Sequence, residues 1–382
     1  MTFPLPPNAT IGIIGGGQLG RMSAMAAARL GYRCHVFTPE ADSPASQVAA
    51  RTTEAAFEDL DALRAFAAQV DVITFEFENV PAEGLDALAA LRPVRPSPAI
   101  LRISQDRIAE KSFVNQAGIA TAPWRAVTTP RELERALAEL GFPAVLKTTR
   151  LGYDGKGQVP LRDMADAARA WAALASMPLI LEGFVDFALE ISVIVARGAD
   201  GALACFDTVE NRHRDHILDL TLAPAPIPPA VDAEAQRIAR RIAKALDLVG
   251  LLAIEMFVDR DGRVKVNELA PRPHNSGHWS IDACPASQFE MHIRAVAGLP
   301  LPPARRHSDA VMKNLVGPRE IALWPRILAS DGLIPHHYGK TEARAGRKMG
   351  HVTRLFPLGG LPGAHGIAAA LGPLAPVVPQ EE

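Results

Sequence analysis

One stretch of this chain, residues 253–278, constrains the fold more than any other, because it has the pattern of a β-hairpin. Two apolar runs flank a turn at residues 259–262, and the turn ends in Asp-Gly, which is a strong hairpin signal. This turn predicts that Val258 faces Arg263 and that the two strands are antiparallel.

The hairpin carries two glutamates, Glu255 and Glu268. Side chains alternate between the faces of a strand, so the predicted register places both glutamates on one face with Phe257, Val264 and Val266. They become diagonal neighbours, about 7–8 Å apart at the backbone. Two acids on an apolar face are costly to bury without cations, so the pair predicts a Mg²⁺ site. A register slip of one residue would place them on opposite faces and remove the argument.

Composition permits a large enzyme and excludes several other classes. The chain has 382 residues, of which 48% are hydrophobic, and two to four structural units are expected. A formal net charge of −2 provides no overall attraction to nucleic acid, and an aromatic fraction of 5% argues against a base-stacking surface. Nucleic acid is therefore not expected as a partner. No signal peptide or membrane-spanning run is recognisable, so a membrane is not expected as a partner either.

The three cysteines, Cys34, Cys205 and Cys284, lie far apart in the sequence. Without a CxxC spacing they offer no zinc framework, and their small number suits a reducing cytoplasm.

The N-terminal part has the alternation of an α/β unit. A short apolar strand at residues 10–14 leads through a glycine-rich turn at 15–20 into an alanine-rich helix at 21–30. Further strands are predicted at 33–37 and 70–75. Strands that alternate with helices at this spacing indicate a parallel sheet.

The glycines in the turn leave three interpretations open. Gly15, Gly17 and Gly20 satisfy GxGxxG between a strand and a helix, as in dinucleotide-binding folds, with Glu40 or Asp42 as the ribose-binding acid. Such a turn can also bind another phosphate, because helix N-terminal N–H groups point outward there. It can also be no more than a tight turn.

A second glycine-rich loop follows an apolar strand that ends at Lys147. The loop spans residues 152–158, contains Lys156 and leads into a further strand at 159–161. It is not a Walker A motif, because no GK[ST] opens a helix. A strand, a flexible loop and a strand can instead close over the phosphates of a nucleotide.

Several polar residues lie at or just beyond predicted strands. Glu76 and Glu78 follow the strand at 70–75, at the edge where open α/β sheets bind ligands. Residues 179–185 suit an adenine pocket. A carboxylate at Glu190 could accept from a ribose hydroxyl, and residues 210–213 are expected after another strand.

Six segments carry a family resemblance: GIIGGGQLGRM, TFEFENVP, SQDR, GYDGKGQ, NELAPRPHNSGHW and KTEARAGRKMGH. Together they resemble the N5-carboxyaminoimidazole ribonucleotide synthetases of de novo purine synthesis, which are ATP-grasp enzymes. The resemblance runs from about residue 10 to about residue 357 and meets no departure at a motif position.

The resemblance implies a mixed α/β and α+β fold. It divides the chain into an N-terminal Rossmann-like preATP-grasp domain at 1–104, an ATP-grasp domain at 105–300 with a lid near 112–180, and a small C-terminal domain with the tail at 301–382. A homodimer in the cytoplasm is expected by the same resemblance.

The implied reaction is the ATP-dependent carboxylation of 5-aminoimidazole ribonucleotide with bicarbonate, through carboxyphosphate. A formate-dependent ribonucleotide transformylase of the same superfamily is the nearest alternative. A nicotinamide-dependent oxidoreductase, supported by GxGxxG, and a non-catalytic nucleotide sensor are the more distant alternatives.

By the same resemblance, each ligand has its expected residues. Mg²⁺ is assigned to Glu255 and Glu268. ATP is assigned to Arg107, Lys147, Gly152, Tyr153, Asp154, Gly155, Lys156, Gly157, Gln158, Glu182, Gly183, Phe184, Val185, Glu190, His213, Asn267 and Glu268. The ribonucleotide is assigned to Glu76, Tyr153, Arg272, His274, Asn275, Ser276, Lys340, Arg347 and Lys348. The candidate catalytic residues are Arg272, for the charge of carboxyphosphate, His274 or Glu76, for a proton, and Lys156.

Overall fold

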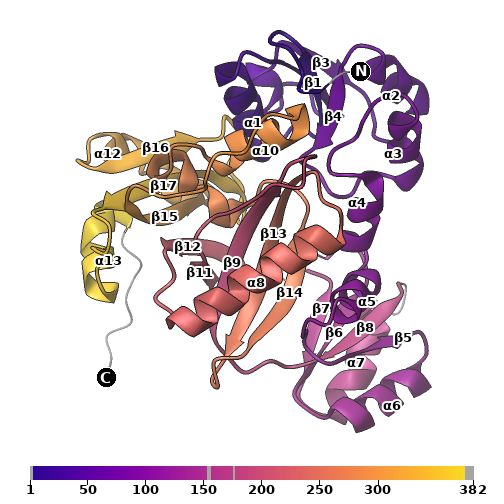
Figure 1. The fold of residues 1–382 in the computed structure, drawn as a ribbon. Coiled ribbons are helices and arrows are strands. Elements are labelled where there is room, and N and C mark those ends of the chain that lie inside the picture. Colours follow the sequence, from indigo (N-terminus) through magenta and orange to yellow (C-terminus); the bar gives the residue numbers. More distant parts are fainter. Residues whose placement is uncertain (1–2, 153–155, 175–176, 375–382) are drawn as a thin grey trace.

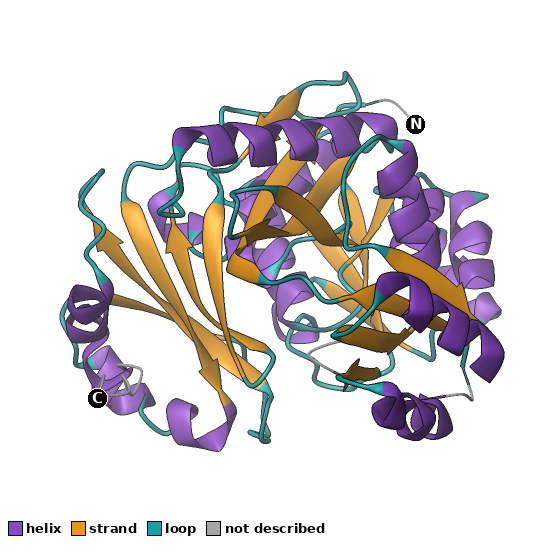
Figure 2. Cartoon of the chain, turned by 90° about the horizontal axis from the view of Figure 1, so that it is seen from below, coloured by secondary structure: helices purple, strands orange, loops and turns teal. Residues whose placement is uncertain are grey.

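The computed structural model describes residues 3–152, 156–174 and 177–374, and within them the strands form three sheets (Figure 1). Figure 2 shows that strands occupy the centre of the molecule and that helices lie mostly around them. In the described parts of the chain no helix is long and apolar enough to cross a bilayer.

The first sheet is parallel, as predicted. Its strands are β1 (Thr10–Ile14), β2 (Arg33–Thr38), β3 (Arg51–Glu54) and β4 (Val72–Phe75), in the order β3-β2-β1-β4. Strand β3 was not predicted because it is a polar edge strand without a buried side chain. Helix α1 (Gln18–Arg29) begins before the predicted start at Arg21, with Gly17 as its N-cap.

Alternate residues of β1 enter two different cores. Ile11 and Ile13 pack with α1 and α10 (Gln288–Ala297) on one face of the sheet. Ile14 packs on the other face, which is covered by α2 (Leu60–Ala67), α3 (Ala82–Ala89) and α4 (Pro98–Ser104). The first sheet is therefore buried on both sides, which explains the continuous apolar character of its central strands.

Helix α10 places His292 in this core. The side chain is 1% exposed, and its Nε2 lies 2.8 Å from Thr74 Oγ1 on β4. Burial lowers the pKa of His292 to about 3. In the unfolded chain His292 binds a proton below about pH 6.5, whereas in the folded state it stays neutral down to about pH 3. The free energy of unfolding therefore falls as the pH falls below about 6.5.

We expect His292→Gln to flatten the acid dependence of stability, because an amide can still bond Thr74 but does not titrate. Between about pH 6.5 and pH 5 the free energy of unfolding of the variant should fall by about 2 kcal/mol less than that of the wild type. Urea unfolding at both pH values measures this difference. His365→Gln, at an exposed site, is the control; equal acid slopes for wild type and His292→Gln would refute the expectation.

A short connection through α4 and α5 (Arg107–Gln116) leads to the second sheet. Its antiparallel strands are β5 (Trp124–Val127), β6 (Ala144–Thr148), β7 (Gln158–Leu161) and β8 (Leu179–Gly183), in the order β5-β8-β6-β7. Helices α6 (Pro130–Leu140) and α7 (Met164–Leu174) pack on it around one core. The predicted strand–loop–strand unit is the β6–β7 pair.

The third sheet is antiparallel and contains nine strands in the described residues. Eight lie in the order β14-β13-β9-β11-β12-β15-β17-β16, and β10 pairs with β9. Their bounds are β9 (Phe187–Arg197), β10 (Leu203–Cys205), β11 (Val209–Arg214), β12 (Ile217–Ala223), β13 (Gly250–Asp259), β14 (Val264–Ala270), β15 (Asp309–Val316), β16 (Leu333–His337) and β17 (Lys348–Phe356). The C-terminal strands thus continue the same sheet through the β12–β15 pair.

Helices cover both faces of the third sheet. Helix α8 (Pro229–Ala245) lies across β9, β13 and β14 (Figure 1) and buries its apolar side against them. Helices α9 (Ser280–Ala283) and α10 pack against the opposite face near Trp279. The remaining short elements are η1 (Ser46–Val48), η2 (Asn275–Gly277), α11 (Gly317–Ile321), α12 (Trp324–Leu328), α13 (Ala364–Leu371) and η3 (Gly372–Leu374).

The predicted hairpin is present, but its register is different. Val258 faces Val264 rather than Arg263, and a β-bulge at Asn267 inserts one extra residue into β14. Beyond the bulge Glu255 faces Glu268 directly, so the predicted diagonal arrangement is wrong. Such a bulge aims a side chain that a regular ladder would direct elsewhere.

Two further predictions need correction. Val264 and Val266 do not share a face with the glutamates; they pack in the core under α8. Residues 210–213 do not follow a strand but lie within β11, which places Asn211 and His213 in the middle of the third sheet.

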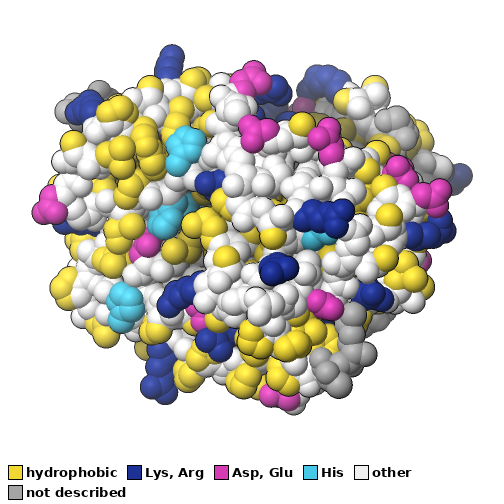
Figure 3. Space-filling model, turned by 90° about the horizontal axis from the view of Figure 1, so that it is seen from above, with side chains coloured by type: hydrophobic (Ala, Val, Ile, Leu, Met, Phe, Trp, Pro, Cys, Tyr) yellow, Lys and Arg dark blue, Asp and Glu magenta, His cyan; other side chains and the backbone are white. Residues whose placement is uncertain are grey.

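The surface agrees with the small net charge. On the face shown in Figure 3, Lys and Arg side chains are scattered among Asp and Glu side chains.

Candidate active site

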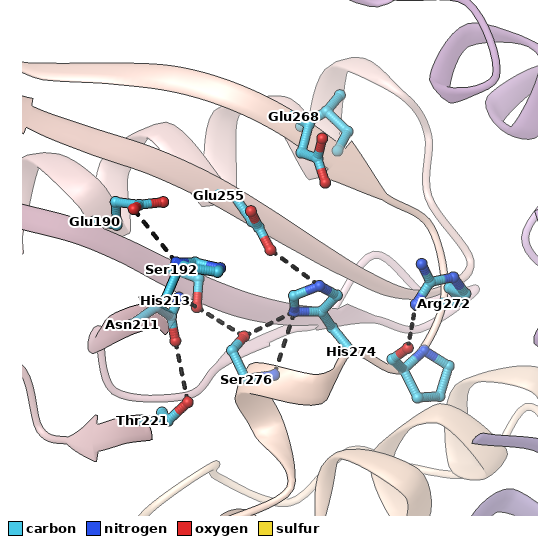
Figure 4. A network of polar contacts seen from close by, with 12 residues as sticks. Glu190, Ser192, Asn211, His213, Thr221, Glu255, Glu268, Arg272, His274 and Ser276 are labelled. Carbon is cyan, nitrogen blue, oxygen red and sulfur yellow. Dashed lines mark hydrogen bonds and ion pairs between the residues drawn. The ribbon is translucent and has the colours of Figure 1, made fainter. Parts of the chain in front are cut away.

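The site is built around Glu255 on β13 and Glu268 on β14, which face each other on the side of the third sheet away from α8 (Figure 4). Burial and the negative charge of Glu255 raise the pKa of Glu268, and Arg107 partly offsets them. Burial would also raise the pKa of Glu255, but His274 and nearby positive charges lower it. The surroundings therefore favour the ionised form of Glu255 and disfavour the ionised form of Glu268.

This pair fits a divalent cation. Two carboxylates opposite each other raise the pKa of one of them, and a bound cation removes that repulsion. The described residues contain no cluster of three or more His, Cys, Asp or Glu side chains that could enclose a metal ion by themselves. Mg²⁺ commonly takes one or two protein carboxylates and completes its coordination with water and substrate phosphates.

His274 orients Glu255. Its Nε2 lies 3.0 Å from Glu255 Oε1, while its Nδ1 accepts from the backbone N–H of Ser276 at 3.3 Å. Because an N–H group can only donate, Nδ1 carries no proton, and the proton on Nε2 points to Glu255. The histidine therefore presents a donor to a carboxylate of the proposed metal pair.

A chain of hydrogen bonds between buried side chains ends at His274 and holds its ring in place (Figure 4). Thr221 Oγ1 donates to Asn211 Oδ1 at 3.1 Å, and Asn211 Nδ2 donates to Ser192 Oγ at 2.9 Å. Ser192 Oγ then donates to Ser276 Oγ at 2.8 Å, and Ser276 Oγ lies 2.9 Å from His274 Nδ1. Sequence reasoning named only the last two residues, because the others lie in strands with no recognisable motif.

Lys147 and Glu182, both assigned to ATP, lie together on the second sheet. Lys147 Nζ donates to Glu182 Oε2 at 2.9 Å across the β6–β8 pair, and Lys111 Nζ lies 3.4 Å from Glu182 Oε1. Burial lowers the pKa of Lys147, although Glu182 opposes this. A lysine near the end of a strand, with a side chain that is 13% exposed, is well placed to meet a phosphate.

Arg107 links these two residues to the carboxylate pair. Its Nη1 lies 3.6 Å from Glu268 Oε2, and its Nη2 donates to the carbonyl of Gly152 at 3.4 Å. Arg107 thus joins the start of the second glycine-rich loop to β14.

Glu190 and His213, both assigned to ATP, lie together. His213 Nδ1 is 3.3 Å from Glu190 Oε1 across the β9–β11 pair. Burial would lower the pKa of His213, but the hydrogen bond and charge of Glu190 raise it.

Asn267, also assigned to ATP, lies on β14, and the other residues assigned to ATP are spread along β7, β8 and the adjoining loops. Phe184 is 54% exposed and Val185 is buried, so their side chains face different surroundings. Gly157 has a φ of +71°, which favours glycine at that position. The assignments to Tyr153, Asp154 and Gly155 fall outside the described residues.

Glu76 fills the glycine-rich turn of the first sheet. Its Oε1 accepts from the N–H of Gly17 at 2.7 Å, and a Cβ added at Gly15 or Gly17 would lie within 3 Å of its carboxylate. Burial raises its pKa, whereas the Gly17 N–H group, Arg272 and Lys340 lower it. A dinucleotide phosphate in this turn would meet a carboxylate instead of free N–H groups, which disfavours the dinucleotide interpretation.

Glu78 is a site residue that the sequence prediction left out. Its Oε1 lies 2.8 Å from Arg272 Nε, so the loop after β4 is tied to the loop after β14. Both glutamates of TFEFEN therefore reach the site. The sequence signal for Glu78 was present, but a solvated loop residue explained it equally well.

The C-terminal basic cluster contributes Lys340, Arg347 and Lys348. Burial and the charge of Arg347 lower the pKa of Lys340 to about 8, and Lys340 Nζ donates to the carbonyl of Lys348 at 2.8 Å. Arg347 Nη1 donates to the carbonyl of Glu342 at 2.8 Å. Cations held this close together favour an anionic ligand.

Asn275 offers unused hydrogen-bonding groups. Its side chain is 8% exposed, and neither its Oδ1 nor its Nδ2 has a partner among the described residues. A buried amide of this kind calls for a ligand or water.

Comparison with known proteins identifies three parts of the chain. Residues 8–105 match the ribonucleotide synthetase preATP-grasp domain and residues 112–289 the ATP-grasp domain. Residues 310–357 match the phosphoribosylaminoimidazole carboxylase C-terminal domain. The fold is therefore an ATP-grasp fold with an N-terminal preATP-grasp domain, as the resemblance implied.

Curated relatives agree over nearly the whole chain. The N5-carboxyaminoimidazole ribonucleotide synthase of Brucella melitensis is 54% identical over 355 residues, covering 92% of this chain and 98% of its own. The synthase of the same name from Bacillus subtilis is 45% identical, with 91% of each chain covered.

Solved structures give the same result. An ADP complex of an N5-carboxyaminoimidazole ribonucleotide synthetase is 44% identical, with a TM-score of 0.90, and the match covers 93% of this chain and 94% of that one. The Aspergillus clavatus N5-carboxyaminoimidazole synthase in complex with ADP and 5-aminoimidazole ribonucleotide is 32% identical, with a TM-score of 0.88 and 96% and 97% coverage. The chain therefore belongs to the N5-carboxyaminoimidazole ribonucleotide synthetase family of ATP-grasp enzymes.

Proposed function

We propose that this protein carboxylates 5-aminoimidazole ribonucleotide with bicarbonate and ATP, forming N5-carboxyaminoimidazole ribonucleotide, ADP and phosphate in de novo purine synthesis. The relatives that carry this name cover more than nine-tenths of the chain, and one of them is seen with ADP and the ribonucleotide.

One structural observation supports the proposal above the others: a continuous series of charges joins the two halves of the site. It begins at Lys147 and Glu182 on the nucleotide side, and Arg107 connects these to Glu268. Arg272, four residues beyond Glu268 on the loop after β14, carries the series on to Glu78, its ion-pair partner at 2.8 Å. This arrangement supports our proposal that the phosphoryl group passes the carboxylate pair on its way from ATP to the second substrate.

The chemistry explains the need for such a site. Bicarbonate is a poor electrophile, so one of its oxygens takes the γ-phosphoryl group of ATP, and ADP leaves. The resulting carboxyphosphate breaks its C–O bond to give CO₂ and phosphate, and the exocyclic amine of the ribonucleotide attacks the CO₂ carbon and loses a proton. Confinement protects the labile carboxyphosphate from water and keeps CO₂ beside the amine. Mg²⁺ held by Glu255 and Glu268 supplies charge neutralisation for the phosphates.

Three residues receive roles in this proposal. Arg272, on the loop after β14 and ion-paired to Glu78, stabilises the negative charge of carboxyphosphate. His274 holds Glu255 in place through its Nε2 proton. Because that proton is already directed at Glu255, Glu76 is the better candidate to take the proton of the amine, and its pKa is raised by burial.

The test is ADP release measured with bicarbonate, with and without 5-aminoimidazole ribonucleotide. ADP release should require bicarbonate, rise with the ribonucleotide and be matched by carboxylated product. Turnover with formate in place of bicarbonate would indicate the transformylase, and ATP binding without turnover would indicate a nucleotide sensor. Tight nicotinamide-nucleotide binding in the absence of ATP would indicate an oxidoreductase.

Gly17→Ala tests the assignment of Glu76 to the ribonucleotide. An added Cβ would lie 2.8–2.9 Å from the Glu76 carboxylate oxygens, so the carboxylate must move away from the Gly17 N–H group. We expect the KM for the ribonucleotide to rise about tenfold, in keeping with a lost charge-assisted hydrogen bond of ~1.5 kcal/mol, while the KM for ATP stays the same. Saturation curves for both substrates measure this.

Gly363→Ala is the matched control, since a Cβ there meets no atom within 4 Å. It should leave both KM values unchanged. A Gly17→Ala enzyme with wild-type affinity for the ribonucleotide would show that Glu76 is not needed in its present position.

The organisation of the chain and its partners complete the proposal. We place domain boundaries near residues 104 and 300, with a lid near 112–180, and we expect a cytoplasmic homodimer. Light scattering of the purified protein tests the oligomeric state; a monomer at all concentrations would contradict the dimer.

A further inference from the structure

Helix α5 buries two adjacent charged residues that the proposed mechanism does not use. Glu110 is 3% exposed and Lys111 is 1% exposed. Burying a charge is costly unless it is paired and hydrogen-bonded, so the partners of these two residues indicate what they do.

Lys111 connects the two sides of the site. Its Nζ lies 3.4 Å from Glu182 Oε1 on β8 and donates to the backbone carbonyl of Asn267 at 3.3 Å. Glu182 is also the partner of Lys147, the proposed phosphate contact. One ammonium group therefore joins the nucleotide side to the bulge in β14.

Glu110 holds the other side of that bulge. Its Oε1 accepts from the backbone N–H of Leu269 at 2.6 Å. Lys111 and Glu110 thus bind the residues immediately before and after Glu268. A bulge disrupts the hydrogen-bond ladder locally, so its backbone depends more than a regular strand does on contacts from outside.

We propose that Lys111 and Glu110 are positioning residues: they fix the backbone on both sides of Glu268 and so couple nucleotide binding to Mg²⁺ binding. The inference rests on the proposed nucleotide and metal sites but does not depend on the carboxylation. Neither residue lies in one of the six segments that carry the family resemblance. A Glu and a Lys in a helix usually lie on its solvent-exposed face.

Nucleotide and metal binding without turnover provides the test. Calorimetric titration of ADP, with and without saturating Mg²⁺, gives the factor by which Mg²⁺ tightens ADP binding. In Lys111→Met we expect this factor to fall about 10- to 100-fold, the range found when a residue that orients a metal ligand is removed.

Lys313→Met is the matched control. Lys313 is also 1% exposed and is paired with two acids, Asp219 and Glu320, at 2.7 and 3.0 Å, but it lies on β15. Its substitution removes an equally buried ammonium group and should leave the Mg²⁺ factor unchanged.

Glu110 gives a second, independent comparison. Glu110→Gln keeps an oxygen that can accept from Leu269 N–H and should retain the wild-type Mg²⁺ factor. Glu110→Leu removes the acceptor and should resemble Lys111→Met. This comparison decides the matter if Lys111→Met does not fold.

A wild-type Mg²⁺ factor in folded Lys111→Met, or in folded Glu110→Leu, would overturn the inference. An equal loss in Lys313→Met or in Glu110→Gln would also overturn it, because the effect would then be general destabilisation. If the wild-type protein itself binds no Mg-ADP, the proposed function is refuted, and this inference is refuted with it. A loss of the Mg²⁺ factor confined to the variants concerns this inference only.

Discussion

Glu255→Gln and Glu268→Gln should each reduce ATP turnover by about 10³-fold, the upper end of the effect of removing one electrostatic stabiliser. Each change removes one of the two facing carboxylates and leaves the triphosphate charge less compensated. Folding should survive, because an amide has nearly the same shape and the repulsion between the two acids disappears. Steady-state ADP release at saturating Mg²⁺ measures the loss, and circular dichroism checks the fold.

Glu290→Gln is the matched control for both changes. Glu290 is 5% exposed and ion-paired to Arg294, but it lies on α10 outside the site. Its turnover should stay near that of the wild type. Near-wild-type turnover in either Glu255→Gln or Glu268→Gln would show that the carboxylate pair does not hold a catalytic metal ion.

Arg347→Ala should raise the KM for the ribonucleotide by about 10- to 100-fold. A phosphate monoester is best held by several cations, and each charge-assisted hydrogen bond is worth about 1.5–3 kcal/mol. The KM for ATP should barely change, because the residues proposed to bind the nucleotide, such as Lys147 and Glu182, lie on the second sheet. Two saturation curves on the variant, one for each substrate, measure the difference.

The same loop provides the control, Arg344→Ala. Arg344 is 68% exposed and pairs with Glu342, so its removal takes away the same charge at a solvated position. It should shift neither curve by more than about twofold, as expected of an exposed ion pair. If only the ATP curve shifted in Arg347→Ala, the basic cluster would bind ATP, and its assignment to the ribonucleotide would be wrong.

Local patterns were enough to predict the elements that carry the site. The strand, glycine-rich turn and helix at the N-terminus, the strand–loop–strand unit around Lys147 and the hairpin with Glu255 and Glu268 are all present. Each depends on interactions between residues close in sequence, such as turn chemistry and alternation of apolar residues. The errors concerned register, as in the Val258–Val264 pairing, the limits of elements, as in α1 and β11, and polar edges such as β3.

Contacts between segments that are distant in the sequence could not be predicted from local patterns. No local pattern shows that Glu78 pairs with Arg272, or that Glu76 lies within the glycine-rich turn. Buried charges on helices are also invisible in the sequence, since Glu110 and Lys111 look like residues of a solvated helix face.

The sequence by itself determined the fold class, the family and the hairpin that carries Glu255 and Glu268, because these depend on the order and type of neighbouring residues. Only the tertiary structure decided that a bulge at Asn267 brings Glu255 and Glu268 directly opposite each other. The physical reason is that a bulge is held by contacts from outside its own strands, here from Lys111 and Glu110, more than 150 residues away along the chain.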